Sequence, residues 1–247
     1  MKVSVCMATY NGEKHIKEQV VSILDQRFVD FPETTLELII SDDNSTDRTI
    51  EEVNALNDRR IKIIIHKKKT YKYYNALISA SKNFENSIKH STGDYIFLSD
   101  QDDIWYPDKL DKMLKILQKK TCCVHSFDWI DQHKKHLGKE VFSEKPQKPL
   151  SLMKRFPYYG FCLGFEKKIK NKILPFPSIP QHDIYIGLVA SLKGELAICT
   201  DILCAHRKYT HDASIVNVST SGFKVPIMVK IFYRFKLIFF ALIRSHQ

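Results

Sequence analysis

Five aspartates gather at two points of the chain, each directly after a short apolar run of the kind that forms a buried strand. They are Asp42, Asp43, Asp100, Asp102 and Asp103. Carboxylates repel phosphate unless a divalent cation lies between them. Mg²⁺ and Mn²⁺ commonly bind through one or two carboxylates together with substrate phosphates. The two groups therefore indicate a site for a metal ion and a diphosphate.

A structural role is the alternative for these aspartates. Aspartates that precede helices often act as N-caps and complement the helix dipole, which would explain either group taken alone. Two groups that each end a buried strand of one sheet favour a site, because a cap does not require that placement.

The elements that must position these side chains follow an alternating pattern between Met1 and about Ser99. Apolar runs predict strands over residues 3–7, 36–40, 61–65 and 95–98. Helix-like segments lie between them, so we expect βαβ units, a mostly parallel Rossmann-like sheet flanked by helices, and an α/β fold. Ligands of such sheets bind at the carboxyl ends of the strands. The loops ATYNG, SDDNS and SDQDD should therefore converge on one site.

Three helices are predicted in this half from apolar stripes at helical spacing. They cover about residues 16–24, 50–56 and 110–117. Ser45 or Thr46 is expected to cap the second of them.

The pattern is looser beyond residue 120, and no domain linker stands out. We expect strands over residues 122–129, 161–165 and 196–203, and a short helix over residues 184–192 behind the turn PQHD. Residues 131–150 are polar, lysine-rich and interrupted by prolines, as is typical of a surface loop.

Several classes of function lack their sequence signals. No GxGxxG follows the first strand and no GxxxxGK[ST] occurs, which argues against a dinucleotide site and an ATP-type P-loop. The net charge of +10 favours anionic partners. A nucleic-acid-binding protein is disfavoured, because no RNP-like, zinc-finger or helix-turn-helix motif is present and the acidic loops have the wrong sign for a phosphate backbone.

The six cysteines include no CxxC pair, and most lie in apolar runs. They are therefore interpreted as reduced core residues, which favours a cytoplasmic compartment. The apolar stretch at the N-terminus is too short for a signal peptide and is interpreted as a strand.

The motifs ATYNGE, ELIISDDNSTDRTIEEV and TGDYIFLSDQDDIWYPDKLDKM occur in this order. With them the chain resembles the family 2 glycosyltransferases of the GT-A fold, especially the bacterial rhamnosyltransferase-like branch of polysaccharide synthesis. The resemblance covers roughly residues 1–215. It implies a nucleotide-sugar donor, Mn²⁺ or Mg²⁺, and an inverting transfer of a hexosyl or rhamnosyl group to a hydroxyl acceptor. We expect residues 1–120 to bind the donor and residues 121–215 to bind the acceptor.

The resemblance also implies roles for individual residues. Those expected to bind the donor are Thr9, Tyr10, Asn11, Asp42, Asp43 and Asp100. Asp43 would accept a hydrogen bond from the imide N–H of a pyrimidine base. In the DxD element, Asp102 is the expected metal ligand, with Asp100 and His211 as further candidates. Trp105 and Pro107 are expected to shape the following turn.

Asp183 resembles the acidic residue that opens a helix in this family and removes a proton from the acceptor hydroxyl. It is the predicted catalytic base, and a plain N-cap is its alternative role. Relatives often carry Tyr-Arg-x-His after the last core strand, whereas this chain has Tyr209 at the histidine position. His206 or His211 could replace that metal ligand, and Arg207 or Lys208 could neutralise the diphosphate.

The segment 223–247 has five basic residues, no acidic residue and many apolar ones. A spanning helix is disfavoured, because each buried charge would cost about 2.5 to 3.5 kcal/mol at its centre. We expect a basic amphipathic helix on the inner face of the cell membrane, with the following residues among the acyl chains: Ile227, Ile231, Phe235, Ile238 and Phe239. Packing on the catalytic domain or on a second copy is the alternative.

The predicted activity is metal-dependent sugar transfer from a dTDP- or UDP-linked donor to a saccharide, expected to be lipid-linked, in cell-surface polysaccharide synthesis. Two alternatives stay open. A nucleotidyltransferase would also need carboxylates and a diphosphate. A non-catalytic nucleotide-sugar-binding protein is the other alternative, because the expected histidine is replaced.

Overall fold

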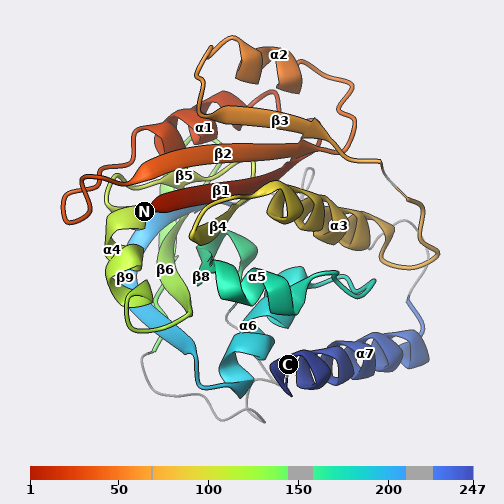
Figure 1. The fold of residues 1–247 in the computed structure, drawn as a ribbon. Helices are drawn as coiled ribbons and strands as arrows, with labels where there is room; N and C mark the ends of the chain where they lie inside the picture. Colours follow the sequence, from red (N-terminus) through yellow and green to blue (C-terminus); the bar gives the residue numbers. More distant parts are fainter. Residues whose placement is uncertain (68, 144–157, 210–224, 247) are drawn as a thin grey trace.

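The structure is a computed structural model that describes residues 1–67, 69–143, 158–209 and 225–246. One sheet runs through the molecule (Figure 1). The strands are β1 Lys2–Thr9, β2 Thr35–Asp42, β3 Ile61–Ile65, β4 Tyr95–Ser99, β5 Ile104–Trp105, β6 Cys122–Ile130, β7 His136–Glu140, β8 Leu163–Glu166 and β9 Leu196–Arg207. Within the described ranges their order is β3-β2-β1-β4-β8-β6-β9-β5, and β7 pairs with β6.

Helices cover this sheet. They are α1 Ile16–Leu24, α2 Thr49–Asn54, α3 Asn75–His90, α4 Lys109–Leu117, α5 Lys167–Ile173, α6 His182–Leu192 and α7 Ile227–His246, with a short 3₁₀ turn η2 at Gly160–Cys162. Helix α3 packs against β1 and β2, and α4 packs against β6, β8 and β9. The predicted α/β class with a mostly parallel sheet in its first half is confirmed.

The first four strands are parallel neighbours, and their register brings three loops together. Thr9 at the end of β1 pairs with Asp42 at the end of β2, and Met7 pairs with Ser99 at the end of β4. Because parallel strands end at the same edge, the three predicted loops begin side by side.

The second half of the sheet mixes directions. Strand β6 is parallel to β9 and antiparallel to β8, and β8 joins β4 of the first half. The predicted surface loop 131–150 is wrong in part, because β7 forms a hairpin with β6 inside it. Strand β7 buries no side chain and so lacks the apolar alternation that would have revealed it.

Helix α3 was not predicted, although it is 16 residues long. Five of its eight buried side chains are polar, including Ser79, Ser81 and Ser87, so few apolar residues mark its buried face. The predicted cap of the second helix is also wrong. Helix α2 begins at Thr49, whose backbone N–H donates to Asp47 Oδ1 at 3.0 Å, and neither Ser45 nor Thr46 caps it.

Helix α7 lies against α6 and α5 at one side of the molecule (Figure 1). Leu237 and Ala241 are buried against the protein core, and Ile238 packs beside them, so its predicted place among acyl chains is wrong. Large apolar side chains on the other side of α7 are exposed. They are Ile227, Met228, Ile231, Phe232, Phe235, Phe239, Leu242 and Ile243.

In the described part of the chain, no helix combines the length and the hydrophobicity that crossing a bilayer requires. All six cysteines are described and each is buried, as predicted for core residues. None of them forms a disulfide.

Candidate functional site

The loop after β1 is held in place by a side chain of the DxD element. Gln101 Oε1 accepts hydrogen bonds from the Thr9 hydroxyl (2.6 Å) and the Tyr10 backbone N–H (2.9 Å). Asn11 adopts a left-handed backbone conformation with φ of 49°, and its side-chain oxygen accepts from the Thr46 N–H. Tyr10 is 43% exposed. The predicted donor-binding residues of this loop therefore lie at the sheet edge, with Tyr10 open to solvent.

Asp42 and Asp43 differ in their surroundings. Both carboxylate oxygens of buried Asp42 accept hydrogen bonds from Ser45, which closes the turn after β2. Asp43 is also buried, and its Oδ1 lies 2.5 Å from His66 Nδ1. The His66 backbone N–H donates to the Asp42 carbonyl, so this histidine is fixed beside both residues. Asp42 thus has a structural role, whereas Asp43 is a carboxylate oriented by an imidazole.

Three potential metal ligands converge at the DxD loop, and we call them the metal cluster. Asp100, Asp103 and His206 each offer one ligand atom, and these atoms lie within 4.8 Å of one another. Asp103 is fully buried, and its Oδ1 lies 2.6 Å from His206 Nδ1. Its other oxygen, Oδ2, is buried and has no hydrogen-bond partner in the described ranges. A buried carboxylate oxygen without a donor fits a bound cation.

The electrostatics of this cluster agree with a place for positive charge. The pKa of Asp100 is raised to about 8, by burial first and then by the charges of Asp103 and Asp102. Burial alone would lower the pKa of His206, but the nearby carboxylates, Asp103 first, raise it to about 9. Like charges held this close favour a divalent cation, whose charge would offset their repulsion.

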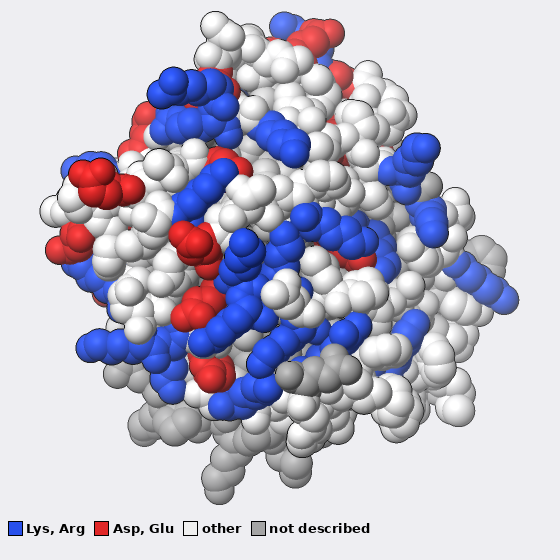
Figure 2. All heavy atoms as spheres, in the orientation of Figure 1, with Lys and Arg blue, Asp and Glu red and all other residues white. Residues whose placement is uncertain are grey.

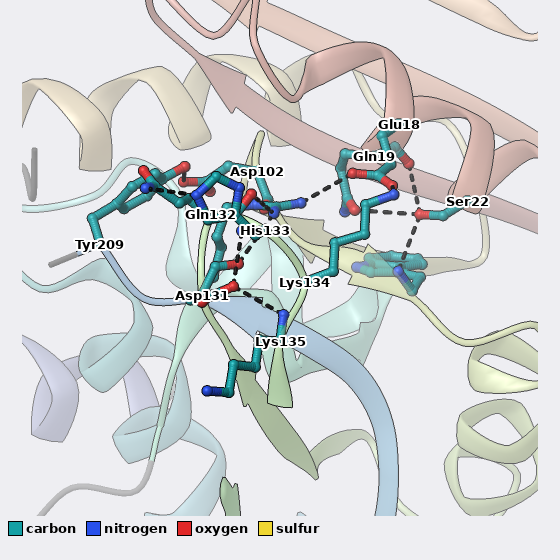
Figure 3. A network of polar contacts seen from close by, with 12 residues as sticks. Glu18, Gln19, Ser22, Asp102, Asp131, Gln132, His133, Lys134, Lys135 and Tyr209 are labelled. Atoms are coloured by element: carbon teal, nitrogen blue, oxygen red, sulfur yellow. Dashed lines mark hydrogen bonds and ion pairs between the residues drawn. The ribbon is translucent and has the colours of Figure 1, made fainter. Parts of the chain in front are cut away.

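Asp102, the predicted metal ligand, accepts hydrogen bonds from residues at and just after the end of β9 (Figure 3). The Tyr209 hydroxyl donates to Asp102 Oδ2 at 2.7 Å. Buried Arg207 donates to the Asp102 carbonyl and to the Gln132 carbonyl, and pairs with Glu18. Arg207 is thus a clamp between loops, and its predicted contact with a diphosphate is wrong for this arrangement. Lys208 is exposed and lies over the Trp129 ring.

Asp183 lies in the first turn of α6, where Gln181 is the N-cap residue. Its alternative role as the N-cap is therefore wrong. A Cβ on Gly160 would approach Asp183 Cβ at 3.9 Å, and the Asp183 charge is among those that raise the pKa of Asp100. Burial raises the pKa of Asp183 itself to about 6. A carboxyl group with that pKa can accept a proton near neutral pH.

The structure thus brings Asp100, Asp103 and His206 together, and the charges of Asp102 and Asp183 act on Asp100. Asp43 follows β2, which is separated from β4 by β1. His211 lies outside the described residues. Trp105 is 2% exposed and structural, as expected. Sequence reasoning missed Gln101 and His66. Only their positions, inside the DxD element and directly after β3, could have pointed to them.

Two relatives of this chain have names that describe transfer from a nucleotide sugar. Over 226 residues the chain is 31% identical to the UDP-Glc:alpha-D-GlcNAc-diphosphoundecaprenol beta-1,3-glucosyltransferase WfgD of Escherichia coli, with 90% of this chain and 81% of WfgD covered. Over 117 residues it is 41% identical to the dTDP-rhamnosyl transferase RfbG of Shigella flexneri, with 45% of this chain and 36% of RfbG covered.

Solved structures show the same fold. S. aureus TarS 1-349 in complex with UDP matches with a TM-score of 0.65 and 20% identity, over 84% of this chain and 61% of TarS 1-349. The mannosyltransferase PcManGT from Pyrobaculum calidifontis, in complex with GDP-Man and Mn²⁺, matches with a TM-score of 0.55 and 16% identity, over 98% of this chain and 73% of PcManGT. At these identities the likeness concerns the fold alone, which is the predicted GT-A type.

The family model described as glycosyl transferase family 2 matches residues 4–174, well over half of the chain. The match contains the β1 loop and both aspartate groups, and it agrees with the resemblance of the three motifs. The chain therefore belongs to glycosyl transferase family 2.

Proposed function

We propose that this protein transfers a hexosyl or rhamnosyl group from a nucleotide-sugar donor to a hydroxyl of a lipid-linked saccharide, with inversion and with the help of a divalent cation. The observation that carries the proposal is a cluster of side chains that could hold a cation, close to the half-buried carboxyl group of Asp183. Asp100, Asp103 and His206 supply the cluster, and Asp183 lies close enough to raise the pKa of Asp100.

The residues present suit Mg²⁺ or Mn²⁺, because carboxylate oxygens dominate the ligand set. When bound, such an ion stabilises the charge that develops on the departing nucleoside diphosphate. Asp100 and Asp103 would hold it, and His206 or Asp102 would complete its shell. The pKa of the Asp102 carboxyl group is raised, by burial first and then by the charge of Asp103, so Asp102 also faces excess negative charge.

Asp183 would receive the proton of the acceptor hydroxyl on its carboxylate as that oxygen attacks the anomeric carbon. An inverting transfer needs one such base, on the face of the sugar opposite the leaving group. The raised pKa of Asp183 makes its carboxylate a stronger base than an ordinary aspartate. Its position in the first turn of α6 fixes it beside Gly160.

A pyrimidine donor is supported by Asp43. Its carboxylate can accept the imide N–H of uracil or thymine, and His66 orients it from the other side. WfgD uses a UDP-linked sugar and RfbG is a dTDP-rhamnosyl transferase by name, and both bases carry that imide. We therefore propose UDP or dTDP as the nucleotide of the donor.

Membrane attachment is the part of the proposal that concerns α7. Its exposed apolar side chains form a stripe along the helix, and Lys230 and Arg234 are exposed beside it. Figure 2 shows Lys and Arg side chains gathered over the middle of the face on which α3 and α5 lie in Figure 1. An apolar stripe with basic neighbours suits an anionic lipid surface, where a lipid-linked acceptor would be presented.

Thermal stability with nucleotides tests the proposed site. A ligand that binds the native state raises its melting temperature, so UDP, dTDP, GDP and CDP are compared with Mn²⁺, with Mg²⁺ and with EDTA. We expect stabilisation by UDP or dTDP that requires the metal, followed by release of that nucleoside diphosphate from a matching sugar donor. Pyrophosphate release would indicate a nucleotidyltransferase instead. Metal-dependent binding with no turnover across acceptors would indicate a non-catalytic protein.

A further inference from the structure

Three aromatic rings from the second half of the chain meet at the cluster formed by Asp100, Asp103 and His206. Two come from strands β6 and β9, and one comes from the residue before η2. Trp129 of β6 pairs in register with His206 of β9, so both side chains lie on the same face of the sheet. Their ring centroids are 5.2 Å apart. Tyr159 lies 6.3 Å from Trp129 and nearly perpendicular to it, at 89°. These three rings form a corner, which we call the aromatic corner.

The aromatic corner is not simply part of the core. Behind it, Phe127 and Phe161 are buried, and Phe161 stacks on His206 at 4.1 Å. Trp129, Tyr159 and His206 are only half-buried. Buried rings thus support a layer of rings that still reach solvent, which is how a rigid binding surface is built.

The aromatic corner adjoins both the proposed cation ligands and the proposed catalytic base. His206 bonds to Asp103 of the metal cluster at 2.6 Å. Tyr159 directly precedes Gly160, whose added Cβ would lie 3.9 Å from Asp183 Cβ. A ring that rests on Trp129 and Tyr159 would therefore lie beside the residues proposed to hold the cation and beside the proposed base.

We propose that Trp129 and Tyr159 form the subsite that binds the pyranose ring of the acceptor saccharide and turns its reacting hydroxyl toward Asp183. This inference rests on the proposed function. One face of a pyranose ring presents C–H groups, which pack on the apolar face of an aromatic side chain. The perpendicular rings contact two sides of one sugar, and a sugar held on two sides has few orientations left.

The acceptor, rather than the donor sugar, fits this position. The predicted donor residues, Thr9 to Asn11 and Asp43, come from β1 and β2, whereas both aromatic residues come from the second half of the chain. Asp100 of the metal cluster follows β4, which lies between β1 and β8 in the sheet. In a direct displacement the acceptor approaches from the side opposite the departing nucleotide.

Intrinsic fluorescence gives a direct test, because the chain has two tryptophans and Trp105 is only 2% exposed. The probe is N-acetylglucosamine α-diphosphate carrying a short alkyl chain, together with a panel of methyl glycosides, added to protein that holds UDP or dTDP and Mn²⁺. We expect at least one saccharide to change the emission of the wild-type protein, and Trp129→Phe to abolish that change. A response that persists in Trp129→Phe overturns the proposal, as does the absence of any saccharide response in a protein that binds nucleotide.

Kinetics with the same acceptor separates the subsite from the rest of the site. We expect Trp129→Ala and Tyr159→Ala to raise the acceptor KM roughly 5- to 50-fold, while Trp129→Phe stays near the wild type. The donor KM should rise less than the acceptor KM in both alanine variants. The control is Leu137→Ala on the paired strand β7, where the side chain is 50% exposed.

The outcomes are distinct. A rise in the donor KM in place of the acceptor KM overturns the assignment to the acceptor. Unchanged acceptor KM in both alanine variants overturns the subsite while leaving the proposed function intact. Failure of the wild-type protein to bind any nucleotide contradicts the proposed function itself.

Discussion

Asp183 is the residue on which the proposed reaction depends most. Its carboxyl group has a pKa of about 6, because burial disfavours the charged form. Only the ionised carboxylate can accept a proton, so the rate should fall as the pH drops through about 6. Asp183→Asn should lower turnover about 10²- to 10⁴-fold and leave donor affinity unchanged. Initial rates of nucleoside diphosphate release between acidic and basic pH, with calorimetry of donor binding, check both. Near-wild-type turnover would exclude Asp183 as the base.

The raised pKa of Asp183 also makes the free energy of unfolding depend on pH. The folded-state pKa of about 6 exceeds the ordinary 3.8, so the native state holds more protons than the unfolded state between these values. Stability contributed by this group is therefore present at low pH and lost as the pH rises through 6. Asp183→Asn should raise the melting temperature above pH 7 by roughly 2 to 8 °C, with no gain near pH 4. An equal gain at both pH values would contradict this assignment.

Tyr209 marks the departure from the pattern of related sequences at the metal site. Its hydroxyl donates to Asp102 Oδ2, and so competes with a cation for that carboxylate. Tyr209→His would replace the phenol with an imidazole that can ligate the metal. We expect the Mn²⁺ concentration needed for half-maximal nucleotide binding to fall about tenfold, with Tyr209→Phe as the control for loss of the hydroxyl. An unchanged Mn²⁺ requirement in Tyr209→His would mean that this position does not face the ion.

At the scale of elements, the contact between the loops after β1 and β4 fixes the predicted donor-binding residues at the edge of the sheet. A methyl group on Gly12 would lie 2.5 Å from Gln101 Oε1, so glycine allows this glutamine to reach Thr9 and Tyr10. Gly12→Ala should therefore displace Gln101, weaken donor binding and destabilise the fold by about 1 to 3 kcal/mol. A double-mutant cycle by chemical denaturation checks the cause, since Gly12→Ala should cost less in a Gln101→Ala background. Additive losses would show that the clash lies elsewhere.

The elements themselves were predictable where apolar residues cluster along the chain. The parallel strands β1, β2, β3 and β4 are rich in apolar residues, each with at most one polar residue inside its run, and the sequence indicated all of them. Helix α3 and strand β7 escaped prediction for the same reason, because each buries few apolar side chains or none. The buried face of α3 is largely small and polar, whereas β7 buries nothing. Hydrophobic periodicity reports burial of apolar side chains, so it misses elements that do without it.

At the scale of the whole molecule, the charge of +10 and the exposed stripe of α7 should act together. Phe235→Ser with Phe239→Ser should abolish flotation with vesicles that contain anionic lipid and leave the melting temperature within about 2 °C. Wild-type binding should weaken as salt is raised, because the basic residues are exposed. Leu237→Ala on the packed side is the contrasting variant, and should cost about 2 to 5 kcal/mol of stability. Undiminished flotation of the double variant would contradict the membrane role of α7.

The sequence by itself determined the fold class, the edge at which the loops meet, and the family, because strand periodicity and three ordered motifs are local properties of the chain. It also pointed to Asp43, Asp100 and Asp183 and to the apolar character of α7. Only the tertiary structure decided which atoms meet. His206 reaches Asp103 across 103 residues of sequence. Trp129 and Tyr159 come together through the antiparallel pairing of β6 and β8 and the turn before β8. Such contacts depend on strand register and packing, which no local pattern encodes.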